Sequence, residues 1–263
     1  DLAQTDLMTV IMAQVPAAII ASIVAVVTLT IIATVRKEGP DEARRLAYHA
    51  QLEKEEGGSD FRVNPLYAIV PLVPLVLLVL GSKQIAVLPL TDVPTAMIVG
   101  TMLALVVTRQ NPQEITRKFF DGMGEAYGGV IGLIVSAAVF TAGMAAMGLT
   151  DALIEAMKGS ESIARIAGAF GPFIIAVISG SGDAAALAFN GAITPQAEAF
   201  GMSIINLGSL AQMAGSIGRS MSPVAGAALV CAGLAKVSPM ELSKRNALPM
   251  LLATITFMIV LFL

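Results

Sequence analysis

Two short polar segments interrupt a long apolar region of the chain and hold most of its candidate binding groups. The first is Ser179-Gly180-Ser181-Gly182-Asp183, and the second is residues 215–223, GSIGRSMSP, with Arg219 in its middle. Hydroxyl, backbone N–H and guanidinium groups donate hydrogen bonds to carboxylates, and a guanidinium can do so bidentately. The carboxylate of Asp183 can hold a proton or a cation instead. These residue types predict a binding site for a small organic anion.

The candidate substrate-binding residues lie in these two segments, or on the helix expected after the first. They are Ser179, Gly180, Ser181, Gly182, Asp183, Asn190, Gly218, Arg219, Ser220 and Ser222. Asp183 is also the candidate coupling-ion residue, because intramembrane carboxylates are costly and usually functional. Structural roles stay open as alternatives: Asp183 as a helix cap, an Arg219–Asp183 bridge, serines that satisfy backbone groups, and Asn190 as a link between helices.

The scarcity of cysteine and histidine argues against an enzyme. Cys231 and His49 are each the only residue of their type, so a Cys/His metal site is not available, and the HExxH pattern is absent. A serine hydrolase would need His49 to leave a strongly charged segment. No basic patch is interleaved with aromatic residues, which argues against nucleic acid as a partner. We expect no enzyme activity, no cofactor and no metal.

The composition places the polar segments inside a membrane. Hydrophobic residues make up 56% of the 263 residues and charged residues only 13%, against about 25% in soluble chains. Mean hydropathy is +0.81. Thirteen of the charged residues lie between Arg36 and Arg62. These features predict an all-α polytopic membrane protein with one charged connector.

Apolar runs of about 20 residues mark helices that can cross a bilayer. The predicted spans are Met8–Val35, Pro65–Leu80, Val93–Thr108, Ala126–Leu149 and Ala247–Leu263, with an amphipathic, interfacial helix at Pro112–Glu125. The expected division is residues 1–35, a first scaffold helix; 36–64, a charged cytoplasmic connector; 65–125, scaffold helices with the interfacial helix; 126–246, a transport domain; and 247–263, a final transmembrane helix.

Lysine and arginine near span ends favour the cytoplasmic side. They gather at residues 36–62, 109–118 and 236–245. If all three groups lie on the cytoplasmic side, the span Ala126–Leu149 ends on the opposite side and the last span begins on the cytoplasmic side. Residues 163–235 must then begin outside the cell and finish in the cytoplasm, with an odd number of crossings.

A re-entrant hairpin followed by one broken helix satisfies this count. Ile163–Ile178 would enter, turn at residues 179–183 and return as Ala184–Ile193, and residues 201–235 would cross once, unwound at 215–222. The alternative is three full crossings, but Ala184–Ile193 would be only about 15 Å long as a helix. Non-helical backbone at membrane depth is tolerated where it lines a cavity, and broken helices of this kind bind the substrates of secondary transporters.

Each break is followed by an expected helix N-terminus. Asp183 is the predicted N-cap of Ala184–Ile193, and Ser222 that of the next helix, with Pro223 in its first position. A helix N-terminus is partly positive and has free N–H groups. Two such ends that face one cavity would bind an anion.

The same segments resemble a known family. SGSGDAAALAFNGAITP (179–195), GSIGRSMSPVAGAALVCAG (215–233) and KRNALPM (244–250) are similar to the C4-dicarboxylate transporter family typified by DcuC, within the ion transporter superfamily. The resemblance implies an inverted-repeat fold in which each repeat has scaffold helices, a re-entrant hairpin and a broken transmembrane helix. One hairpin and one broken helix are visible here, so the chain resembles the C-terminal repeat, half of such a transporter.

The resemblance also implies a function and partners. We expect alternating-access exchange, efflux or uptake of succinate, fumarate or malate in the bacterial cytoplasmic (inner) membrane, with coupling to H⁺ or Na⁺. The expected partners are the substrate, the lipid bilayer, an N-terminal repeat on the same or a companion chain, and a second copy in a homodimer. The alternatives are a carrier of another organic anion, such as citrate or gluconate, and a passive anion channel.

Overall fold

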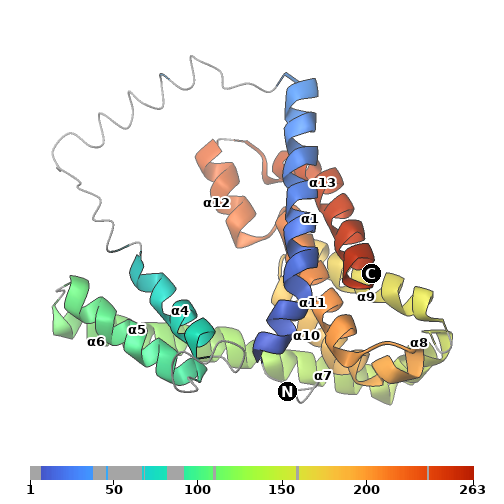
Figure 1. Ribbon diagram of the computed structural model, residues 1–263, viewed down its shortest axis with the longest axis horizontal. Coiled ribbons are helices and arrows are strands. Elements are labelled where there is room, and N and C mark those ends of the chain that lie inside the picture. The colour runs from blue at the N-terminus through green and yellow to red at the C-terminus, as the bar shows by residue number, and fades with distance from the viewer. Residues whose placement is uncertain are drawn as a thin grey trace. The chain divides into compact units, whose positions relative to one another are not determined.

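The computed structural model describes residues 7–37, 69–81, 92–108, 111–157, 160–235 and 237–263, together with Leu46 and Tyr67. In this part of the chain all regular elements are helical (Figure 1). In chain order they are α1 (Leu7–Val35), η1 (Val70–Leu72), α4 (Val73–Leu80), α5 (Val93–Thr108), α6 (Pro112–Ala126), η2 (Tyr127–Ile131), α7 (Gly132–Ala146), α8 (Leu149–Met157), α9 (Glu161–Ser179), α10 (Gly182–Ala192), η3 (Thr194–Phe200), α11 (Ile204–Met221), α12 (Gly226–Ala235) and α13 (Pro239–Leu261).

Several of these helices are built to lie in lipid. Four segments are long and apolar enough to cross a membrane: Met8–Val35, Glu161–Ser179, Ile204–Ala235 and Pro239–Leu261. Large apolar side chains are exposed along them; Val26 on α1, for example, is 65% exposed and Leu234 on α12 is 78% exposed. Apolar surface on this scale is unfavourable in water, whereas lipid accommodates it. The chain is therefore a multi-pass membrane protein, as its composition predicted.

Residues 39–127 form one of two compact units. The predicted helix Val93–Thr108 is α5, which packs against α4, although both are shorter than a usual span. The predicted amphipathic helix is α6, where the Asn111 side chain accepts a hydrogen bond from a first-turn N–H at 3.0 Å. Lys118 and Glu114 form an ion pair of 3.2 Å on its exposed surface. Most of the predicted connector, residues 36–64, lies outside the described residues.

In the second unit, residues 1–38 and 128–263, the predicted span Ala126–Leu149 is a helical segment that ends at a bend. A π-helical turn, η2, leads into α7, and the chain then bends by 78° before α8. Gly148 lies at this bend with a φ of 70°, a left-handed conformation that glycine adopts without steric cost. The bent pair α7–α8 is apolar and long enough to be a fifth span or a re-entrant segment.

The first and last spanning helices, α1 and α13, lie side by side in this unit (Figure 1). They run antiparallel, because the start of α1 meets the end of α13. Ala17 and Ala21 of α1 are buried there with Ala253 and Phe257 of α13. Small residues four apart let two helix backbones approach closely in a membrane. This contact accounts for the two described residues of α1 that are fully buried.

The last helix begins eight residues earlier than predicted, at Pro239 instead of Ala247. Ser238 is its N-cap, with a hydroxyl that accepts a hydrogen bond from a first-turn N–H at 3.3 Å. Proline fits the first helical position, where its missing N–H has no partner to lose. Lys244 and Arg245 therefore lie within α13 and not in a turn that precedes it.

The predicted hairpin is present as two helices, α9 and α10, which fold back on each other and pack against α11. The chain reverses at Gly180, whose φ is 76°. Gly171 on α9 consequently faces the ring of Phe189 on α10. Gly168 leaves room for Leu207 and Leu210 of α11, both fully buried. After α10, residues 194–200 form a 3₁₀ helix, η3.

Candidate functional site

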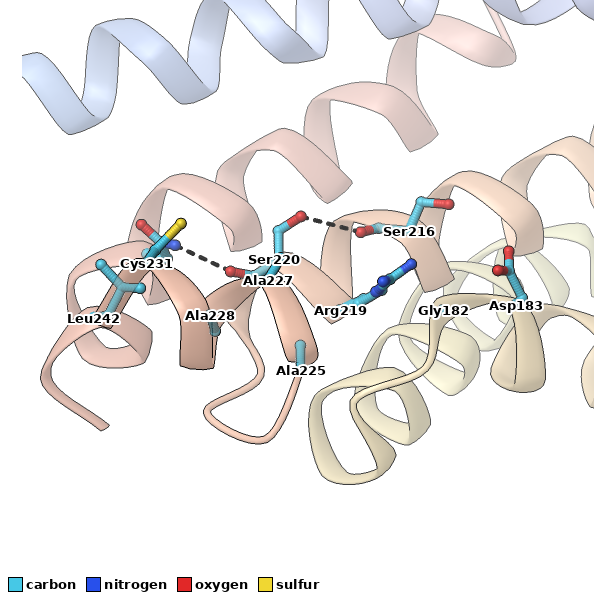
Figure 2. A pocket seen from close by; sticks show the side chains of 11 residues that line it. Gly182, Asp183, Ser216, Arg219, Ser220, Ala225, Ala227, Ala228, Cys231 and Leu242 are labelled. Carbon is cyan, nitrogen blue, oxygen red and sulfur yellow. Dashed lines mark hydrogen bonds between the residues drawn. The ribbon is translucent and has the colours of Figure 1, made fainter. Parts of the chain in front are cut away.

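Four helices meet at one cavity of about 340 Å³ (Figure 2): α10 at its start, α11 at its end, and α12 and α13 in their first two turns. Its walls combine the few polar side chains of this region with small residues. The lining residues are Gly182, Asp183, Ser216, Arg219, Ser220, Ala225, Ala227, Ala228, Cys231, Leu242 and Asn246. Of the ten predicted binding residues, four line this cavity: Gly182, Asp183, Arg219 and Ser220.

The helix α10 begins differently from the prediction. Its N-cap is Ser181 and not Asp183: the backbone of Ser181 is extended, and its hydroxyl accepts a hydrogen bond from the N–H of Ala184 at 3.2 Å. A cap residue needs this non-helical geometry, which Asp183 lacks because it lies in the first turn. The carboxylate of Asp183 is therefore not used for capping, and it is exposed in the cavity.

The other residues of the hairpin tip shape the turn. The hydroxyl of Ser179 accepts a hydrogen bond from the N–H of Ser181 at 3.2 Å. Gly180 packs against the backbone of Val224 and Ala225, where a Cβ atom would lie 3.1 Å from both. The tip thus contacts the segment between α11 and α12. Ser179, Gly180 and Ser181 are not among the residues that line the cavity.

The predicted unwound segment, residues 215–222, is mostly helical. The helix α11 continues to Met221, and the break is limited to residues 222–225. The hydroxyl of Ser216 donates to the carbonyl of Gln212 at 3.0 Å. The hydroxyl of Ser220 donates to the carbonyl of Ser216 at 3.3 Å (Figure 2), so both groups are satisfied within the helix. Polar residues and glycines in this stretch therefore did not mark an unwound backbone.

Ser222 and Pro223 also differ from prediction. Ser222 is buried and is the C-cap of α11, and its hydroxyl accepts a hydrogen bond from the N–H of Val224 at 3.3 Å. The next helix, α12, begins at Gly226, three residues after Pro223. The turn at residues 222–225 thus separates the end of α11 from the start of α12.

The glycines of α11 serve close packing. A Cβ atom on Gly218 would clash with the backbone of Phe173 on α9, and Gly218 does not line the cavity. Gly215 faces the backbone of Gly182 at the start of α10 in the same way. These two contacts hold the α9–α10 hairpin directly against α11 and so place Asp183 beside the cavity that Arg219 lines.

Two side chains of α13 complete the site from outside the predicted residues. The Asn246 amide donates to the carbonyl of Ser220 at 3.0 Å, and the Ser243 hydroxyl donates to the carbonyl of Met221. Together they bind carbonyl groups at the negative end of α11. Asn246 also lines the cavity. It belongs to KRNALPM, so the resemblance itself could have suggested it.

Asn190 lies away from this cavity. Its amide nitrogen donates to the carbonyl of Gly208 at 3.4 Å, and its oxygen accepts a hydrogen bond from the Thr194 hydroxyl at 2.7 Å. These bonds link the end of α10 to α11, which is the structural alternative considered for this residue.

Asp183 and Arg219 are not joined by an ion pair in the described part of the chain, although both line the cavity and both are exposed (Figure 2). Their charges cancel in sum. The N-termini of α10 and α12 add a partial positive charge, roughly half an elementary charge each. The cavity therefore offers helix-terminal N–H groups and a guanidinium as hydrogen-bond donors, which suits an organic anion.

The protein is thus a multi-pass membrane protein, helical in all regular elements of its described part, with a cavity between helix ends that a few polar side chains line. The chain belongs to the DcuC family, described as C4-dicarboxylate anaerobic carriers, which matches residues 1–263. The family consists of transporters, and the protein is therefore a transporter and not an enzyme.

The relatives differ in length. A Haemophilus influenzae protein described as a transporter is 43% identical over 249 residues, which cover 93% of this chain and 89% of that protein. The probable anaerobic C4-dicarboxylate transporter DcuC of Vibrio cholerae is 29% identical, over 73% of this chain and 44% of its own length. DcuC of Escherichia coli K12 is 28% identical, over 72% and 42%. The chain thus spans less than half the length of the DcuC proteins. No solved structure matches.

Proposed function

We propose that this chain carries the substrate site of a secondary transporter for C4-dicarboxylates such as succinate, fumarate or malate, which works by alternating access in the bacterial cytoplasmic membrane. Family membership supports the substrate class. The single structural observation that carries the proposal is one cavity at which Arg219 and the first turns of α10 and α12 meet. A charged side chain such as Arg219 costs free energy within a membrane, so residues of this kind usually have a function.

Each group in the cavity has a separate task. The guanidinium of Arg219 binds one carboxylate of the substrate through two N–H donors. The first-turn N–H groups of α12 have no partner one turn earlier in the helix, and they add donors beside Ala227 and Ala228. The Asn246 side chain occupies the carbonyl of Ser220, a residue that lines the cavity, and this carbonyl would otherwise repel the anion. These donors replace part of the hydration that the substrate loses.

Asp183 is the proposed coupling residue. With its carboxylate ionised, the charge of Arg219 is balanced, and the N-termini of α10 and α12 supply the partial positive charge that remains for the substrate. A proton or Na⁺ at Asp183 adds one more positive charge and matches a dianionic substrate better. Binding of the dianion and of the coupling cation would then favour each other, as reciprocal linkage requires.

The second carboxylate of the substrate would need donors from elsewhere. In the proposed assembly these come from an N-terminal repeat, on the same or a companion chain, whose hairpin and broken helix face those described here. The α9–α10 hairpin would be re-entrant, and the break at residues 222–225 would lie at membrane depth. Two copies would form a homodimer through scaffold helices.

Counterflow in proteoliposomes tests this function. The native protein that contains this chain is reconstituted, loaded with succinate and offered labelled succinate outside. We expect trans-stimulated uptake, competition by fumarate and malate but not by gluconate, and loss of uptake in Arg219→Ala.

The alternatives give different results. Competition by citrate or gluconate in place of fumarate would identify a carrier of another organic anion, and flux without trans-stimulation would identify a passive channel. Undiminished counterflow in Arg219→Ala would place the anion elsewhere and overturn the proposed site.

A further inference from the structure

Three basic residues gather at one end of the α1–α13 pair. Arg36 follows the last residue of α1, while Lys244 and Arg245 lie in the second turn of α13. Because the two helices are antiparallel, all three residues line a single cavity of about 250 Å³. The rest of its lining is aliphatic and comes from both helices: Ile31, Ile32, Val35 and Leu248.

This cavity differs in chemistry from the candidate substrate site, with which it shares no lining residue. Its aliphatic walls are open: Ile31 is 57% exposed and Leu248 is 50% exposed. A small soluble anion could use the cations, but it would gain nothing from these walls. Cations beside exposed hydrocarbon fit a ligand that has a negative head and an apolar tail.

The charges at this end favour an anion. Lys244 makes no ion pair within the described residues. Among the described residues that line the cavity, three are basic and none is acidic. The cavity also lies at the end of a 29-residue apolar helix, the depth at which lipid headgroups meet a spanning helix.

We propose that this cavity between α1 and α13 binds one anionic phospholipid, such as phosphatidylglycerol. The phosphate accepts hydrogen bonds from Arg36, Lys244 and Arg245, and an acyl chain lies along the aliphatic walls. Basic pockets between membrane helices bind anionic headgroups in this manner. The site follows from the membrane location alone and does not depend on which substrate the protein carries.

Native mass spectrometry of the full protein, titrated with phosphatidylglycerol or phosphatidylcholine, tests the site. We expect preferential binding of phosphatidylglycerol and a rise in thermal unfolding temperature when it binds. The double variant Lys244→Gln/Arg245→Gln should lower the affinity about fivefold for each cation removed. The matched control is Arg117→Gln/Lys118→Gln, which removes an equally adjacent and exposed basic pair from α6 and should leave the affinity unchanged.

Two further binding measurements distinguish a phospholipid from a free phosphate as the ligand. Glycerol phosphate, which has the charged head without acyl chains, should bind far more weakly than phosphatidylglycerol. Leu248→Gln should weaken the binding of phosphatidylglycerol and leave the binding of glycerol phosphate unaffected. Equal binding of both phospholipids, or equal loss in the α6 control, would overturn the proposal. Glycerol phosphate that binds as tightly as the lipid would show a phosphate site without a lipid role.

Discussion

A Cβ atom added to Gly182 would lie 2.7 Å from the carbonyl oxygen of Gly215, and one added to Gly215 would lie 2.6 Å from the carbonyl oxygen of Gly182. The two backbones are therefore in direct contact where α10 begins and α11 nears its end. This contact brings the hairpin tip to the edge of the cavity. Both obstructing groups are backbone atoms, which cannot move aside as a flexible side chain would.

Alanine at either position should force α10 away from α11. We expect Gly182→Ala and Gly215→Ala each to destabilise the protein by about 1–3 kcal/mol, the usual cost of overpacking. Gly233→Ala on α12 is the matched control, since no atom lies within 4 Å of its added Cβ and alanine favours the helix. Thermal unfolding in detergent measures the difference. Equal stability of all three variants would show that the hairpin can shift freely.

The charge of Asp183 should matter for coupling more than for recognition. In Asp183→Asn the cavity keeps Arg219 and both helix ends, so succinate counterflow should persist. Accumulation driven by a proton or sodium gradient should be lost, because the amide cannot take up the coupling cation. Parallel assays of counterflow and gradient-driven uptake on one preparation make the comparison. Retention of gradient-driven uptake would remove Asp183 as the coupling residue.

Variants of two neighbouring residues of α13 distinguish an effect on stability from an effect on substrate binding. Asn246→Ala and Ser243→Ala each remove one hydrogen bond to the end of α11, worth about 1 kcal/mol. Only Asn246 also lines the cavity. Both variants should unfold at lower temperature, while Asn246→Ala alone should weaken succinate binding. The same binding loss in both variants would show that Asn246 acts only through the helix end.

Cys231 reports occupancy of the cavity without any engineering. It is the only cysteine of the chain, is exposed and lines the cavity. Succinate at ten times its Kd should slow N-ethylmaleimide labelling about tenfold, because only the unoccupied fraction reacts. In the control Cys231→Ser/Leu229→Cys, the thiol lies two residues away and faces a different side of α12. Protection of both thiols, or of neither, would place the substrate outside this cavity.

The local pattern of apolar and charged residues was sufficient to predict much of the fold. The apolar runs predicted α1, α5 and the α9–α10 hairpin to within a few residues, since lipid requires long apolar helices and Gly180 permits the reversal. It also singled out Asp183 and Arg219, because charges are rare and costly among residues 166–235. The resemblance to the DcuC family, drawn from the same residues, is confirmed by the family match.

Helix ends were less predictable, because several nearby residues can serve as a cap. Ser181 and Asp183 are both good N-caps by type, and only the extended backbone of Ser181 shows which one is used. Likewise Gly215 and Gly218 fit an unwound backbone and a close helix contact equally well as residue types. In the structure both glycines lie within α11 and pack closely against α9 and α10.

Hydropathy and charge are properties of single residues and their near neighbours, so they were sufficient to predict the class of the protein and its candidate charged groups. Which groups share a cavity could not be predicted in this way, because it depends on the packing of distant helices. The tertiary structure brought Asn246 and Cys231 to Asp183 and Arg219, and it tied Asn190 into a structural link instead. Contacts between residues far apart in the chain depend on how closely helix backbones approach one another, and here that distance is set at Gly182 and Gly215.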